Sequence, residues 1–275
     1  MDLRTLAKTY LPVPVTDALK IAKYNFDLWT FQKRIVSHRY GYYGFQIHIE
    51  DRVAEEWYDK DWELPPEIRF LVGHGLGPGA LVFDLGAHQC LIAMLLSRQV
   101  GPEGRVVAVE ANRHNAEVAQ RNLALNSVPN VTVLNALISS TIGTDRAAAT
   151  FNSSRDSSAI ASHLIHTLTV DEMVHRFGAP NVIYMDIEGF EIEALKGARE
   201  TLQLPCAWFV ELHGDEQLAR YGAANEDVLR YFPQDAYKAF VCEEHETAFR
   251  PLQGHPPHSR CFLVFVPMKR ARPNA

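Results

Sequence analysis

The sequence predicts a doubly wound α/β fold, in which a mostly parallel sheet carries helices on both faces. From residue 80 onward, short apolar runs alternate with amphipathic runs of helical period, as in βαβ units. The apolar run 81–83 leads into the tight turn 84–87, Asp-Leu-Gly-Ala, and then into a helical pattern. A second apolar run, 105–109, ends in the acidic residue Glu110. Continuous apolar runs of this length are typical of strands buried on both faces.

The same patterns place the elements of this domain in order. Asn112 is the expected N-cap of one helix, and acidic residues mark the first turn of the helix near Asp171. The last two strands are expected to pair as an antiparallel hairpin with a long loop, and residues 139–158 to form a loop or a short edge strand. The expected strands are 80–84, 105–110, 131–134, 182–185, 207–210, 237–242 and 261–267. The expected helices are 89–99, 112–125, one from about 171, 191–202, 215–221 and 226–231.

Residues 1–78 are expected to form a helical and aromatic extension, a cap or lid, in front of a domain at 79–275. An irregular lead-in of 15 residues is expected before a helix that Thr16 caps. Its apolar face is expected to pack on the main domain. That face comprises Leu19, Ala22, Phe26 and Trp29, and Val36 continues it. Further along, 45–49 alternates like a short strand, 55–63 reads as a turn or short helix near the ligand, and Pro65-Pro66 opens another helix.

Composition excludes several classes of protein. The net charge of −6 argues against a protein whose overall surface is basic and binds nucleic acid. No apolar run is long enough to span a bilayer, and the first ten residues lack the apolar core of a secretory signal. The four cysteines are far apart without metal-site spacing, which favours reduced thiols in a cytoplasmic protein. The sequence does not determine the oligomeric state, for which a homodimer is one candidate.

The turn at 84–87 and Glu110 together indicate a ligand that contains adenosine. Small residues let the backbone approach a ligand, and the following helix presents free N–H groups there. An acidic residue at the end of the second strand is placed to accept hydrogen bonds from two ribose hydroxyls. These features alone do not say which adenosine compound binds.

Four motifs make the chain resemble an S-adenosylmethionine-dependent methyltransferase of the FkbM family. They are DLGA at 84–87, VEAN at 109–112, MDIEGFEIEALKGA at 185–198 and FVELH at 209–213. The resemblance covers roughly residues 80–213, and a strand that ends in D-x-E-G-x-E is its most specific part. It implies a Rossmann-like, class I methyltransferase sheet of seven strands whose last strand is antiparallel. It also implies methylation of a hydroxyl group on a small molecule, usually a sugar or a polyketide or glycopeptide-type metabolite.

The resemblance assigns a methyl-donor site to the ends of the first three strands. Asp84 and Gly86 would hold the amino-acid end of S-adenosylmethionine, with Ala87 allowing close backbone approach. Glu110 would bind the ribose. Asn135 and Ala136 would flank the adenine.

The catalytic residues are expected at the ends of the fourth and fifth strands. Asp186 would lie beside the sulfonium, and Asp186, Glu211 and His213 can converge because their strands are neighbours. We expect either His213 or Asp186 to act as the base, with Glu211 orienting the base or the acceptor. The same three residues resemble a ligand set for Mg²⁺, but acid–base work is favoured and no metal is predicted. Glu188 and Glu191 are also read as acidic residues at a helix N-terminus, Glu191 more so.

Three other interpretations stay open. Cys90 stands where such enzymes usually carry a third small residue, glycine, and His88 where asparagine is frequent, so an inactive protein of this fold is one alternative. An NAD-dependent oxidoreductase is another, although the turn has only one of the glycines that a dinucleotide turn needs. The net negative charge and the lack of an N/D-P-P-Y/F motif at the end of a strand argue against a nucleic-acid methyltransferase.

Overall fold

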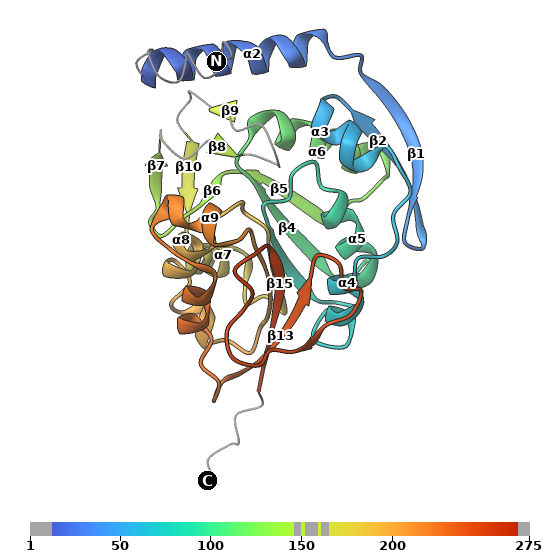
Figure 1. Cartoon of the computed structure of the whole chain (residues 1–275). Helices are drawn as coiled ribbons and strands as arrows, with labels where there is room; N and C mark the ends of the chain where they lie inside the picture. Colours follow the sequence, from blue (N-terminus) through green and yellow to red (C-terminus); the bar gives the residue numbers. More distant parts are fainter. Residues whose placement is uncertain (1–12, 146–149, 152–158, 161–164, 269–275) are drawn as a thin grey trace.

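The computed structural model describes residues 13–145, 150–151, 159–160 and 165–268. Its centre is a mixed sheet of eight strands (Figure 1). These strands are β3 (Leu81–Leu85), β4 (Arg105–Glu110), β5 (Val131–Asn135), β11 (Val182–Met185), β12 (Ala207–Leu212), β13 (Tyr237–Glu243), β14 (Arg250–Pro251) and β15 (Cys261–Pro267). Their order is β14-β13-β15-β12-β11-β3-β4-β5. The predicted α/β class is confirmed.

The direction of the strands also follows the expectation. Strands β12, β11, β3, β4 and β5 are parallel. The last strand, β15, is antiparallel to both of its neighbours, β12 and β13, so the predicted late hairpin is present. The two-residue strand β14 adds an eighth strand to the seven that were expected. Between β3 and β11 the strand order reverses, and ligands of open α/β sheets bind at such a switch point.

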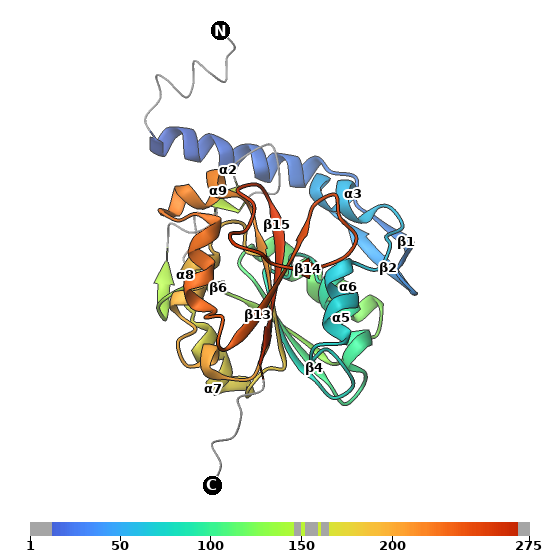
Figure 2. The same cartoon turned by 60° about the horizontal axis from the view of Figure 1, so that its bottom comes forward.

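Helices cover both faces of this sheet (Figures 1 and 2). One face carries α4 (Pro66–Val72), α5 (Leu91–Val100) and α6 (Arg113–Leu125). The other face carries α7 (Val170–Phe177), α8 (Glu191–Lys196), α9 (Asp215–Leu218) and the 3-10 helices η1 (Thr201–Gln203), η2 (Ala219–Tyr221) and η3 (Asn225–Tyr231). The N-cap of α6 is Asn112, as expected, and its side chain accepts the N–H of Asn115.

The helix expected at 191–202 is shorter in the structure and ends at Lys196. A Cβ on Gly197 would lie 2.4 Å from the carbonyl oxygen of Ser139. The close approach of that neighbouring backbone is possible only with glycine, and the chain turns there. The carboxylate of Asp171 then accepts the N–H groups of Glu200 and Thr201, which replaces the helical hydrogen bonds.

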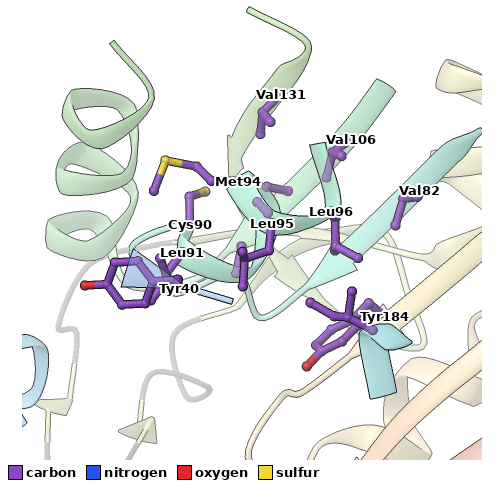
Figure 3. Packing of buried hydrophobic residues seen from close by; sticks show 14 of the residues in the cluster. Tyr40, Val82, Cys90, Leu91, Met94, Leu95, Leu96, Val106, Val131 and Tyr184 are labelled. Atoms are coloured by element: carbon purple, nitrogen blue, oxygen red, sulfur yellow. The ribbon is translucent and has the colours of Figure 1, made fainter. Parts of the chain in front are cut away.

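Two apolar cores fill the space between the sheet and its two helical layers. Figure 3 shows the core on the α5 side, where α5 lies against the strands. Its side chains include Val82, Cys90, Leu91, Met94, Leu95, Leu96, Val106 and Val131. The second core, on the α7 and α8 side, has the fully buried Trp208 and Phe265 among its members. The strands are therefore buried on both faces, as their continuous apolar runs predicted.

The N-terminal extension differs from its prediction in two ways. Helix α2 spans Val13–Thr30, so it begins before the expected cap, and Val36 belongs to strand β1 (Arg34–Tyr40) instead of the helix. Phe26 and Trp29 are 59% and 80% exposed, so these two residues do not pack on the main domain. The helix crosses one end of the molecule (Figure 1). The expected lead-in at 1–12 lies outside the described residues.

The rest of the extension packs closely on the domain. Strand β1 pairs with β2 (Tyr43–Ile49) through a tight turn at Gly41, which has φ of 61° and leaves no room for a Cβ beside Leu64. The expected alternation in β2 is confirmed, because Phe45, Ile47 and Ile49 are buried. Helix α3 (Arg52–Tyr58) follows, and α4 begins at Pro66, as expected. Residues of β1, β2 and α3 share one core with α5. The division into 1–78 and 79–275 stays a prediction.

Short strands lie in and beside the region 139–158, in which a loop or an edge strand was expected. A small sheet joins β6 (Leu137–Ile138), β10 (Ile165–Leu168) and β7 (Gly143–Asp145). A second joins β8 (Thr150–Phe151) and β9 (Ala159–Ile160). The remaining part of 139–158, at 146–149 and 152–158, lies outside the described residues. Within the described ranges, no helix combines the length and the hydropathy that crossing a membrane requires.

The buried Glu67 makes a prediction for stability. Its Oε1 accepts a hydrogen bond of 2.8 Å from the Tyr184 hydroxyl, and burial raises the pKa of Glu67 to about 7. A carboxyl group whose pKa is raised by folding stabilises the fold while protonated, and this contribution is lost as the pH rises from about 4.5 through 7. At about 1.4 kcal/mol per unit of pKa, the loss is roughly 3 kcal/mol.

We therefore expect Glu67→Gln to be more stable than the parent at pH 8 and close to it at pH 5. Glutamine keeps an acceptor for Tyr184 but carries no charge. Urea unfolding at both pH values measures the difference, and Glu103→Gln on the exposed turn before β4 is the control. An equal difference between variant and parent at both pH values would contradict the assignment.

Candidate active site

The candidate site lies where the carboxyl ends of β3, β4, β11 and β12 meet. Gly86 joins its two halves. It follows β3 with φ of 93°, and a Cβ there would lie 1.7 Å from the carbonyl oxygen of Asp186. Only glycine lets the turn after β3 lie against the turn after β11. The two turns that the sequence assigned to donor binding and to catalysis are therefore in direct contact.

Asp84 is the last polar residue on β3 before this turn. It is 1% exposed, and its Oδ2 has no hydrogen-bond partner among the described residues. Burial, with a further contribution from the charge of Glu110, raises the pKa of Asp84 to about 8. A buried carboxyl oxygen without a partner is costly in a folded protein. Such an oxygen is suited to a ligand that brings a donor or a positive charge.

The turn after β3 accommodates Cys90 at the position where the resemblance led us to expect glycine. Cys90 is the N-cap of α5 with φ of 66° and ψ of 22°, and His88 also has a positive φ of 47°. Glycine adopts this left-handed conformation freely, whereas other residues lose roughly 1–2 kcal/mol. The Cys90 side chain is fully buried in the core beside α5. The turn therefore keeps its shape with cysteine in place of glycine.

Glu110 binds the backbone of two neighbouring turns. Its Oε2 accepts the N–H of His88 at 2.8 Å, and its Oε1 accepts the N–H of Asn112 at 2.6 Å. Burial raises the pKa of Glu110 to about 7, against the lowering effect of these hydrogen bonds. The carboxylate thus fixes the turn after β3 to the end of β4.

Asn135 and Ala136 close the same side of the site. The Asn135 amide donates to the carbonyl oxygens of Glu110 at 2.8 Å and Ala111 at 3.1 Å. Ala136 is buried, and its N–H also points to the Glu110 carbonyl. Asn135 therefore holds the ends of β4 and β5 together, whatever it contributes to a ligand.

The N-terminal extension reaches the turn after β3, and the sequence did not identify the residues that do so. The Tyr58 hydroxyl lies 2.6 Å from His88 Nδ1, and burial lowers the pKa of His88 to about 4. Asp51 accepts a hydrogen bond of 2.6 Å from Gln89. On α2, the Tyr24 hydroxyl accepts a hydrogen bond of 3.2 Å from Asn112. Tyr58, in the segment 55–63 that was expected near the ligand, thus lies beside the turn after β3, and its nearness to a ligand stays a prediction.

The structure brings Asp186, Glu211 and His213 together. One ligand atom from each lies within 4.8 Å of the others. His213 Nε2 is 3.4 Å from Asp186 Oδ1 and 3.6 Å from Glu211 Oε1, and Glu188 Oε2 is also 3.4 Å away. The opposite ring nitrogen, Nδ1, is 3.1 Å from Glu191 Oε1. An imidazole thus lies among four carboxyl groups.

These charges determine how the cluster holds protons. Burial disfavours the charged form of His213, but the hydrogen bond with Glu191 and the nearby Asp186 and Glu211 raise its pKa to about 10. Burial raises the pKa of Asp186 well above its usual range and that of Glu188 to about 7. An imidazole that is already protonated cannot accept a proton, whereas the ionised forms of Asp186 and Glu188 can, and their raised pKa values make them stronger bases than ordinary carboxylates.

Sequence reasoning missed the roles of Arg260 and Glu191. Arg260 donates from Nε to Glu211 Oε1 at 2.6 Å. It comes from the loop before β15, and β15 pairs with β12, so only the sheet topology could have placed it here. Glu191 is fully buried, accepts the N–H of Gly189 at 3.0 Å and contacts His213. The interpretation of Glu191 as an acidic residue at a helix N-terminus describes its position in α8 but not its contact with the imidazole of His213. The D-x-E-G-x-E motif, of which Glu191 is the last residue, was the sequence signal for this residue.

Comparison with known proteins gives two kinds of result. Solved structures that match this chain include the methyltransferase FkbM of Methylobacillus flagellatus KT, with 20% identity, coverage of 68% of this chain and 43% of that chain, and a TM-score of 0.43. An O-methyltransferase of Thermotoga maritima has 14% identity, coverage of 87% and 79%, and a TM-score of 0.46. An rRNA methylase of Streptococcus thermophilus has 10% identity, coverage of 74% and 95%, and a TM-score of 0.46. None of the curated proteins compared with the sequence matches it significantly.

The sequence itself matches one family model, whose range includes most of the candidate site but neither Arg260 nor the residues of the N-terminal extension. The model of the methyltransferase FkbM domain matches residues 84–239, from Asp84 in β3 to β13. This range is more than half of the 275 residues, and the protein therefore belongs to the FkbM methyltransferase family.

Proposed function

We propose that the protein transfers a methyl group from S-adenosylmethionine to a hydroxyl group of a small molecule, such as a sugar or a natural-product intermediate. One observation carries the proposal: the turn after β3 lies directly against Asp186, beside the cluster of Glu211 and His213. A donor held at the first turn would present its reactive end to groups that can remove a proton. Membership of a methyltransferase family supports the same chemistry.

The residues at the first turn fit this donor. S-adenosylmethionine carries a positive sulfonium and an ammonium group, and when bound it supplies an activated methyl group. The unpaired Asp84 Oδ2 would accept a hydrogen bond from the ammonium. Glu110 keeps unused lone pairs for ribose hydroxyls beyond its two backbone contacts. We keep Asn135 and Ala136 as the residues that flank the adenine.

Proton removal from the acceptor is assigned to the cluster after β11 and β12. We propose that Asp186, with Glu188 beside it, receives the hydroxyl proton. Glu211, which Arg260 fixes, would orient the acceptor. Of the two bases that the sequence left open, we prefer Asp186 in its ionised form, because Glu191 and the neighbouring carboxyl groups keep His213 protonated. Groups that hold the acceptor in line with the donor contribute to the rate as well.

The net charge of the chain favours an uncharged or cationic acceptor. The whole chain has a net charge of −6, and the carboxyl groups of Asp186, Glu188 and Glu211 lie around His213. A polyanion such as RNA would be repelled from such a surface. Carboxylates are good acceptors for the hydroxyl groups of a sugar, and the aromatic rings of Trp57 and Tyr58 lie beside His88.

Titration calorimetry with S-adenosylmethionine, S-adenosylhomocysteine and NAD tests the proposal. We expect micromolar binding of the two adenosyl sulfur compounds and none of NAD. That result would justify a screen of hydroxyl acceptors with radioactive donor. Binding of NAD alone would replace the proposal with the oxidoreductase alternative. Binding of none would leave a protein of this fold without its activity.

Donor affinity should depend on pH in a defined direction. The raised pKa values of Asp84, about 8, and Glu110, about 7, mean that both are mostly protonated at pH 6. A cationic ligand prefers the ionised carboxylates, so each must release its proton on binding. We expect affinity to rise from pH 6 to pH 8, by up to about tenfold per pH unit for each group below its pKa. Calorimetry in two buffers with different ionisation enthalpies would detect the released protons, and a flat profile would contradict the charge assignment.

A further inference from the structure

We propose that Asp186, Glu211 and His213 form a binding site for one divalent transition-metal cation, of which Mn²⁺ and Zn²⁺ are typical. The inference rests on the proposed function for the cation's role but not for its binding. Each of the three residues offers one ligand atom, and these atoms lie within 4.8 Å of one another. They come from the ends of the neighbouring strands β11 and β12, which fix their positions before any ligand arrives.

The orientation of His213 is the independent observation behind this proposal. Its side chain is only 9% exposed, and Nδ1 is engaged by Glu191, which is itself buried and held by the Gly189 N–H. Histidines that bind metals have this arrangement, in which a carboxylate on one nitrogen directs the other toward the ion. The directed nitrogen, Nε2, points at oxygens of Asp186 and Glu211 at 3.4 and 3.6 Å. These distances exceed those of normal hydrogen bonds.

Asp186 supplies a second sign of a missing partner. Its Oδ1 is buried and has no hydrogen-bond partner among the described residues. Four carboxyl groups, those of Asp186, Glu188, Glu191 and Glu211, are arranged around one imidazole, and Arg260 is the cation that contacts Glu211. A divalent cation among these groups would bind the ionised carboxylates of Asp186 and Glu211.

The ligand set indicates the kind of cation. Two carboxylates and one imidazole suit Mn²⁺, Zn²⁺ and similar ions better than Ca²⁺, which takes six or more oxygen ligands. The ion would displace the Nε2 proton of His213 to the solvent when it binds. Three protein ligands would leave coordination positions open, as in catalytic sites. An acceptor hydroxyl at an open position would have a lowered pKa. With Asp186 held as a ligand, the hydroxyl proton would pass to the ionised Glu188 in place of Asp186, while the oxygen keeps the electron pair; Glu188 faces the same nitrogen of His213.

Binding of Mn²⁺ to the metal-free full-length protein, without donor or acceptor, tests the inference. We expect about one ion per chain by calorimetry and a nitrogen coupling from the imidazole in the pulsed EPR spectrum. His213→Gln should abolish the coupling and weaken binding about tenfold or more. Asp186→Asn should weaken binding while the nitrogen coupling of the residual complex remains. The matched control is His175→Gln, because His175 lies 3.0 Å from Glu200 in an exposed histidine–carboxylate pair.

The outcomes separate this inference from the proposed function. If Mn²⁺ and Zn²⁺ do not bind, or bind equally well to His213→Gln, the metal site is wrong. In that case the methyltransferase proposal still stands when the donor binds and methylation proceeds unchanged in the presence of EDTA. If the cation binds through His213 but the adenosyl compounds do not bind, the metal site stands and the methyltransferase proposal fails. Circular dichroism shows whether each variant is folded, and Asp186→Asn, which preserves shape, provides a second variant if His213→Gln does not fold.

Discussion

Replacing Asp186 by asparagine is expected to lower turnover by about 10²–10⁴-fold, the range of a lost acid–base group. Donor affinity should change far less. Asparagine has nearly the shape of aspartate but cannot receive the hydroxyl proton, and its amide would face His213 Nε2, 3.4 Å from Asp186 Oδ1 in the parent. The measurement is single-turnover methylation with radioactive donor, alongside calorimetry of S-adenosylhomocysteine binding.

The companion variant His213→Ala tests the imidazole that lies among the carboxyl groups of the cluster. Removing the imidazole leaves the buried Glu191 without the contact at 3.1 Å, so turnover should fall strongly here as well. Glu216→Gln, on the exposed side of α9, is the control for a change from acid to amide and should keep full activity. Normal turnover in both Asp186→Asn and His213→Ala would place the active site elsewhere.

Replacing Glu110 by alanine is expected to abolish donor binding, with a loss of about 100-fold or more, while the fold remains. The reason is larger than a lost ribose contact. Both oxygens of this carboxylate hold backbone N–H groups, one on His88 in the turn after β3 and one on Asn112 at the cap of α6. Two buried N–H groups without acceptors cost roughly 1–3 kcal/mol each. The variant should therefore also unfold at a lower temperature.

Glu117→Ala on the same helix layer is the matched control for Glu110→Ala. Glu117 is half exposed and pairs with Arg113 four residues earlier, and such surface pairs contribute little. Its loss should change neither donor affinity nor stability measurably. If Glu110→Ala binds S-adenosylhomocysteine like the parent, the ribose assignment is wrong. If it binds weakly only because it is unfolded, circular dichroism will show that directly.

Local patterns were enough to place the elements of the sheet. The strands 105–110, 182–185 and 261–267 have the bounds that were expected, because buried strands need continuous apolar runs and the turns between them need small or polar residues. The N-cap at Asn112 was also local information. Gly197 ended a helix earlier than expected, because the carbonyl of Ser139, far away in sequence, occupies the place of a side chain.

The extension shows where local patterns fail. Phe26 and Trp29 recur at helical spacing, which normally marks a buried face, yet both are exposed. Val36 fits the same spacing but lies in β1, because pairing with β2 determines its conformation. Helical period is a property of the chain alone, whereas burial depends on what the rest of the molecule places opposite.

The sequence by itself determined the fold class, the family and the identity of most candidate residues, because turns, strand ends and motifs are short-range features. Only the tertiary structure decided how these residues act together. Glu110 serves two backbone turns, Glu191 directs His213, and Arg260 arrives from the loop before β15. Each of these contacts joins segments that are distant along the chain, and their protonation depends on burial and on neighbouring charges. Both are properties of the packed molecule.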